Sequence, residues 1–121
     1  MSKTILIVED NPLNMKLFND ILQGNGYKTV QSSTGKDTLE LAKKHKPDLI
    51  IMDIQLPEMS GLERTKMLKA DDNLKDIPVL AVTAFSLEGG IEKILESGCC
   101  DALGKPIDIP SFLKTVAMYV S

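Results

Sequence analysis

The sequence predicts an α/β protein in which helices cover both faces of a five-stranded parallel sheet. Two patterns support this prediction: short apolar runs alternate with longer amphipathic segments along the chain, and three of the runs are continuously hydrophobic. These three runs are residues 5–8, 49–52 and 79–82. Strands that are apolar on both faces are typical of a parallel sheet covered on both sides. Regular alternation of strand and helix predicts right-handed crossovers within a doubly wound fold.

Two weaker strand segments complete the sheet, at residues 28–31 and 101–104. The segments between the strands begin with residues that are typical of helix N-caps. Asn11 is followed by Pro12, and Ser60 with Glu63 forms a capping-box pattern. The other predicted caps are Thr34, Ser86 and Asp108. The sequence therefore predicts five helices.

Length and composition limit the classes of function. The 121 residues contain no linker, repeat or low-complexity segment, so we expect a single domain, 1–121, without an output domain. A net charge of −3 argues against nucleic-acid binding. No apolar run approaches the ~20 residues of a membrane span, so we expect no membrane insertion. Adjacent Cys99 and Cys100 suit neither a metal site nor an ordinary disulfide. We therefore expect reduced thiols and a cytoplasmic location.

Polar residues follow the strands at their carboxyl ends. Glu9 and Asp10 follow the first strand, Asp53 the third, Thr83 the fourth and Lys105 the fifth. In a flavodoxin-like sheet of order 2-1-3-4-5, the first, third, fourth and fifth strands are neighbours. Because the carboxyl ends of parallel strands share one edge of the sheet, we expect these five side chains to meet in one pocket.

Three carboxylates in such a pocket either raise the pKa of one of them or recruit a cation. Two carboxylates about 4 Å apart repel by ~1 kcal/mol in water and by ~4 kcal/mol at an effective dielectric constant near 20. Oxygen ligands without nearby His or Cys favour Mg²⁺ over zinc. The arrangement predicts a phosphoryl acceptor in which Asp53 is the nucleophile. Lys105 would neutralise phosphoryl oxygens, and Thr83 would donate a hydrogen bond to them.

Four motifs resemble the receiver domains of two-component response regulators: "LIVEDN", "PDLIIMDIQLPEMSG", "VLAVTA" and "GKPID". The resemblance covers essentially the whole chain and extends to the single-domain cell-cycle regulators of that family. It implies that Asp53 accepts a phosphoryl group from a sensor histidine kinase or a phosphotransfer protein. It also implies that Mg²⁺ is held by Glu9, Asp10, Asp53 and the backbone carbonyl of Gln55.

The resemblance further implies how the domain signals. Thr83 matches the switch hydroxyl of the family and Lys105 its phosphate-binding lysine, and the Lys105–Pro106 bond is expected to be cis. Output would pass to downstream regulatory proteins through the fourth helix, fifth strand and fifth helix, from a monomer or weak dimer.

The chain departs from the family pattern at Ala102, where the family usually has Tyr or Phe. This departure puts the usual coupling between the switch threonine and an aromatic ring in doubt. Phe85 is our candidate to fill the space. Gly89 and Gly90 fall inside the predicted fourth helix and would weaken it, which suits a switch segment as well as a long loop.

The sequence leaves one alternative to the output switch open and argues against two others. An intermediate carrier in a multi-step phosphorelay would use the same site. An aspartyl-phosphate hydrolase would need a second acid two residues after the nucleophile, where this chain has Gln55. A flavodoxin-like electron carrier would need a Ser/Thr/Gly-rich phosphate loop, where this chain has Asn11 and Pro12.

Overall fold

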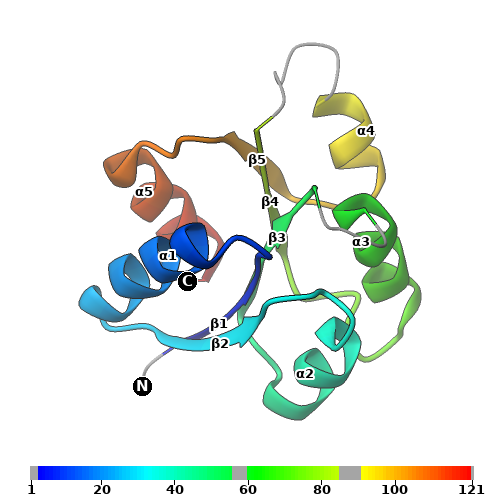
Figure 1. The fold of residues 1–121 in the computed structure, drawn as a ribbon. Helices are drawn as coiled ribbons and strands as arrows, with labels where there is room; N and C mark the ends of the chain where they lie inside the picture. Colours follow the sequence, from blue (N-terminus) through cyan, green and yellow to red (C-terminus); the bar gives the residue numbers. More distant parts are fainter. Residues whose placement is uncertain (1–2, 56–59, 85–90, 121) are drawn as a thin grey trace.

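The computed structural model describes residues 3–55, 60–84 and 91–120. Strands and helices alternate along this part of the chain (Figure 1). The strands are β1 (Thr4–Val8), β2 (Lys28–Ser32), β3 (Leu49–Asp53), β4 (Val79–Thr83) and β5 (Asp101–Gly104). The helices are α1 (Pro12–Gly24), α2 (Thr38–His45), α3 (Gly61–Ala70), α4 (Ile91–Glu96) and α5 (Ile109–Val120).

The five strands form one parallel sheet in the order β2-β1-β3-β4-β5, so the predicted fold class is confirmed. The register pairs Val8 with Met52, Asp53 with Val82, and Thr83 with Gly104. The carboxyl ends of β1, β3, β4 and β5 therefore lie at the same level along one edge of the sheet.

Helices cover both faces of the sheet. Figure 1 shows α1 and α5 on one side, and α2, α3 and α4 on the other. Under α1 and α5, the rings of Phe18 and Phe112 stack with their centroids 5.5 Å apart. Each of these rings is at most 1% exposed, and burial of one such side chain contributes roughly 2–3 kcal/mol. On the opposite face, alternate residues of the strands pack with Ala42, Leu68 and Ile94. These two cores explain the continuous apolar runs of β1, β3 and β4.

Three of the predicted helix caps form as expected. Asn11 Oδ1 accepts hydrogen bonds from the backbone amides of the second and third residues of α1, at 2.9 and 3.1 Å. Ser60 Oγ accepts from the third residue of α3 at 3.3 Å, and Asp108 Oδ2 from the third residue of α5 at 3.1 Å. The caps fix where α1, α3 and α5 begin, next to the carboxyl ends of the strands.

The prediction that Thr34 caps the second helix is wrong. The helix begins four residues later, at Thr38. Thr34 Oγ1 instead accepts from the amide of Lys36, and a turn through Gly35, with φ of +80°, separates it from the helix. Thr38 Oγ1 donates to the carbonyl of Gly35 at 2.7 Å and closes this turn. The predicted cap Ser86 lies outside the described residues.

Both cysteines are free. Cys99 is buried and lies 3.7 Å from Thr65 Oγ1, while Cys100 is half-buried. Burial raises the pKa of both thiols above the ordinary value, that of Cys100 to about 11. Within the ranges that the structure describes, every helix is too short or too polar to span a bilayer.

Candidate functional site

The structure brings four of the five predicted site residues into one pocket at the carboxyl edge of the sheet, and the fifth, Thr83, ends the adjacent strand without lining that pocket. Glu9 and Asp10 directly follow β1, Asp53 ends β3, and Thr83 ends β4. Lys105 directly follows β5, and its backbone amide donates to the carbonyl of Thr83 at 2.7 Å. A pocket of about 420 Å³ opens here, and Glu9, Asp10, Asp53 and Lys105 all line it. Residues from distant parts of the chain thus share one site.

Lys105 connects the two buried carboxylates of the site. Its Nζ lies 2.7 Å from Glu9 Oε1 and 3.3 Å from Asp53 Oδ2. Glu9 and Asp53 are each 1% exposed, whereas Asp10 is exposed. Burial of Lys105 by itself lowers the pKa of its amine, but the hydrogen bond to Glu9 and the charges of both acids outweigh burial and raise it. Lys105 is therefore a fixed positive charge beside the predicted nucleophile.

Asp53 ionises with difficulty in this position. Burial, followed by the closeness of Glu9, raises the pKa of Asp53 from 3.8 to about 6. The amide of Gln55, which donates to Asp53 Oδ1 at 2.9 Å, and the charge of Lys105 oppose this rise without cancelling it. Lys105 supplies one positive charge at this edge, which does not balance the three carboxyl groups of Glu9, Asp10 and Asp53. The imbalance favours a second cation.

The residues present fit a magnesium ion. One carboxylate oxygen from each of Glu9, Asp10 and Asp53 lies within 4.8 Å of the others. All of these donors are hard oxygen ligands, which Mg²⁺ prefers, and the exposed Asp10 leaves the site open to the water ligands that Mg²⁺ usually retains. Gln55 lines the same pocket. Its backbone carbonyl as a further ligand stays a prediction.

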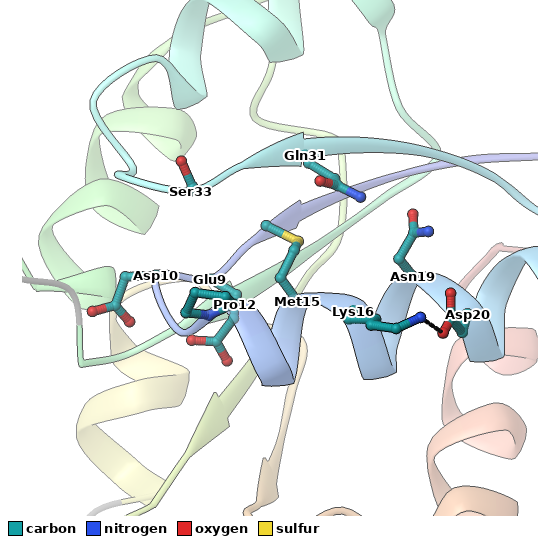
Figure 2. A pocket seen from close by; sticks show the side chains of 9 residues that line it. All are labelled: Glu9, Asp10, Pro12, Met15, Lys16, Asn19, Asp20, Gln31 and Ser33. Carbon is teal, nitrogen blue, oxygen red and sulfur yellow. Dashed lines mark hydrogen bonds and ion pairs between the residues drawn. The ribbon is translucent and has the colours of Figure 1, made fainter.

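The first turn of α1 forms one wall of the site. Asn11, Pro12 and Asn14 line the pocket that contains Asp53. A second hollow, of about 430 Å³, begins at the same acids and follows α1 toward β2 (Figure 2). Figure 2 shows Met15 and Asn19 on the β2 side of α1, and Lys16 paired with Asp20 at 2.8 Å. Successive residues of α1 therefore face two different hollows.

The start of α3 packs directly on the end of β3. The amide of Gly61 donates to the carbonyl of Ile54 at 2.9 Å. A Cβ at Gly61 would lie 2.3 Å from the carbonyl oxygen of Asp53 and 2.8 Å from Ile54 Cα. Only glycine permits this close approach. The start of α3 therefore packs directly against the backbone of Asp53 and restricts its movement.

The structure also locates the departures from the family pattern. Ala102 is buried in β5 beside Ala81 of β4, on the face covered by α2, α3 and α4. The Lys105–Pro106 peptide bond is cis, as the resemblance implied. Phe85, Gly89 and Gly90 lie outside the described residues, so the roles suggested for them stay predictions.

Two features of this region were missed from the sequence. Asn14 lines the pocket of Asp53, and its spacing of three residues from the cap Asn11 could have indicated a shared side of the helix. Arg64 on α3 is 7% exposed, and its Nε has no hydrogen-bond partner among the residues that the structure describes. No pattern in the sequence distinguishes this buried arginine from an exposed one.

The chain is similar to known proteins over nearly its whole length. Residues 5–117 match the family model of the response regulator receiver domain. The polar-differentiation response regulator DivK of Brucella anthropi is 53% identical over 120 residues, which cover 99% of this chain and 98% of that protein. DivK of Brucella abortus strain 2308 is 52% identical over the same coverage. The resemblance to the receiver domains of response regulators is therefore confirmed, and these relatives are response regulators of the DivK type.

Solved structures agree in fold. The receiver domain of sensor histidine kinase PA1611 from Pseudomonas aeruginosa, solved with magnesium in its active-site cleft, is 30% identical with a TM-score of 0.90, covering 99% of this chain and 98% of that one. Chemotaxis protein CheY4 of Vibrio cholerae is 28% identical with a TM-score of 0.89, covering 98% of this chain and 99% of that one.

The matches span nearly the whole chain. The chain belongs to the response regulator receiver domain family of two-component signalling, and within it is similar to the DivK regulators.

Proposed function

We propose that this protein is a magnesium-dependent phosphoacceptor switch whose acceptor is Asp53. One observation carries the proposal: a buried carboxylate ends β3, lies 3.3 Å from the amine of Lys105, and shares a 4.8 Å cluster with Glu9 and Asp10. The donor would be a phosphohistidine on a sensor histidine kinase or on a phosphotransfer protein, which agrees with the family.

In the proposed reaction, a carboxylate oxygen of Asp53 forms a bond to phosphorus while the P–N bond to the donor imidazole breaks. The imidazole nitrogen keeps the electron pair. Lys105 would place positive charge next to the incoming oxygens, and Thr83 at the end of β4 would donate a hydrogen bond to them. Mg²⁺, held by Glu9, Asp10, Asp53 and the carbonyl of Gln55, would supply further positive charge to the phosphoryl group.

The output of the switch would be contact with a downstream regulatory protein through α4, β5 and α5, by a monomer or weak dimer. The name of the Brucella relatives, polar-differentiation response regulator, supports a role in cell-cycle or division control. Because these relatives are named as response regulators, an output switch is favoured over an intermediate phosphorelay carrier. Two free cysteines agree with a reducing compartment, and we therefore place the protein in the cytoplasm.

The experiment that tests this function is incubation with acetyl phosphate and Mg²⁺, followed by intact-protein mass spectrometry. We expect the protein to gain one phosphoryl group that hydroxylamine removes, and Asp53→Asn to gain none. Asp20→Asn, on the exposed surface of α1, is the matched control and should be phosphorylated normally. A phosphohydrolase would release phosphate without accumulating the phosphorylated form. Phosphorylation of Asp53→Asn at the normal level would refute the assignment.

A further inference from the structure

The first turn of α1 presents a neutral amide to the pocket of Asp53. Asn14 lines this pocket together with Asn11 and Pro12, whereas its neighbours do not. Leu13 is 80% exposed, and Met15 lines the separate hollow toward β2 that Figure 2 shows. Among the residues that follow the cap, the helix thus selects Asn14 to face the site.

The side-chain amide of Asn14, unlike its backbone amide, is not needed for the local structure. Asn11 Oδ1 already caps α1, and both oxygens of Glu9 accept hydrogen bonds, one from Lys105 and one from the amide of Asn11. Both oxygens of Asp53 are likewise engaged, by the amide of Gln55 and by Lys105. The half-buried side chain of Asn14, in contrast, makes no hydrogen bond to any other residue within 3–55, 60–84 and 91–120.

An unengaged amide at this place can orient a small molecule in the pocket. It offers one carbonyl oxygen that accepts and one NH₂ group that donates two hydrogen bonds. Asp10 and Gln55 also line this pocket, but they are less suitable, because Asp10 is a candidate metal ligand and Gln55 is exposed. The candidate small molecule is water, since the pocket opens to solvent through the exposed Asp10 and Asn11.

We propose that Asn14 is a positioning residue for hydrolysis of the phosphorylated form, and so sets how long the switch stays on. This inference rests on the proposed phosphorylation of Asp53. In the step, the oxygen of a water molecule forms a bond to phosphorus, and the bond between phosphorus and the Asp53 oxygen breaks. Asp53 leaves as a carboxylate, and the proton of the water goes to the released inorganic phosphate. Asn14 accepts a hydrogen bond from the water and orients it.

The test compares Asn14→Leu, which has nearly the same shape without polar atoms, with Asn14→Gln, which keeps the amide. Each protein is phosphorylated with acetyl phosphate and Mg²⁺, the donor is removed, and the loss of the phosphoryl group is followed by mass spectrometry. A hydrogen bond worth about 1 kcal/mol corresponds to about a fivefold change in rate. We therefore expect Asn14→Leu to hydrolyse about fivefold more slowly, and Asn14→Gln to recover much of the wild-type rate.

Leu13→Ala is the control for a general effect on α1, and it should hydrolyse at the wild-type rate. Unfolding by urea and binding of Mg²⁺ should be unchanged in Asn14→Leu, which separates a positioning role from a structural one. An unchanged or faster hydrolysis in Asn14→Leu overturns the inference, as does an Asn14→Gln variant that is as slow as Asn14→Leu. If the wild-type protein accepts no phosphoryl group at all, the proposed function fails, and that result is distinct from these.

Discussion

At the scale of single residues, Asp53 contributes unfavourably to stability when it is ionised. The residue is 1% exposed, and burial together with Glu9 raises its pKa from 3.8 to about 6. The folded state holds the proton of Asp53 more tightly than the unfolded state does. The contribution of Asp53 to the free energy of unfolding is therefore most favourable below pH 4, and it falls as the pH rises through about 6. The change corresponds to about 3 kcal/mol. The buried, ionised carboxylate that the proposed reaction needs therefore lowers the stability of the folded protein.

This loss of stability predicts the behaviour of Asp53→Asn in metal-free buffer. At pH 7.5 the variant should be more stable than the wild-type protein by up to about 3 kcal/mol, because its neutral amide has no charge to desolvate. At pH 4, where Asp53 is already protonated in the folded state, the difference should become small. Urea unfolding with EDTA at the two pH values measures both quantities. A stability difference that does not depend on pH would contradict the assigned ionisation of Asp53.

The pairing of Lys105 was foreseen only in part. The sequence placed Lys105 at the site as a ligand for phosphoryl oxygens, but the structure has its amine 2.7 Å from Glu9. Spacing along the chain cannot reveal this pairing, because which acid is buried beside the lysine depends on the tertiary contacts of residues 96 positions apart.

At the scale of secondary-structure elements, the contact between α3 and β3 holds the acceptor in place. Gly61 begins α3 against the backbone of Asp53 and Ile54, where there is no room for a Cβ. The helix start therefore fixes the depth at which Asp53 enters the pocket. A turn signal at Gly61 is visible in the sequence, but the close approach of two backbones is not.

Gly61→Ala should destabilise the protein by about 2 kcal/mol or more, because the added methyl group forces α3 away from β3. Phosphorylation by acetyl phosphate should slow in the same variant. Gly24→Ala, at the end of α1, is the matched control: a Cβ there meets nothing within 4 Å, and helix propensity should make it neutral or up to about 1 kcal/mol more stable. Urea unfolding compares the three proteins. Equal stability of the two variants would exclude the proposed role of Gly61.

The starts of helices were predictable where a capping side chain stands next to an apolar face, as at Asn11, Ser60 and Asp108. The prediction failed at Thr34, because a glycine turn lengthens the connection before α2 and the residue before that helix, Asp37, makes no capping hydrogen bond. Arg64 shows a second limit. Its burial on α3 depends on neighbouring elements, and an arginine on a helix is otherwise typical of an exposed face.

At the scale of the whole molecule, the fold and the location of the site followed from topology. Continuous apolar runs predicted a covered parallel sheet, and the strand order places the residues after β1, β3, β4 and β5 at one edge. This reasoning gathers Glu9, Asp10, Asp53 and Lys105 without any knowledge of side-chain contacts. It could not find Asn14, which reaches the pocket from a helix and not from the end of a strand.

Binding of Mg²⁺ to the unphosphorylated protein, measured by isothermal titration calorimetry, tests the central claim most directly. Glu9, Asp10 and Asp53 should together bind one Mg²⁺ ion per chain. Asp10→Asn should weaken binding by at least about tenfold, because the site loses a ligand and a charge. Asp20→Asn, beyond the acid cluster, should bind as the wild-type protein does. Absence of magnesium binding, or binding that Asp10→Asn leaves unchanged, would contradict the account.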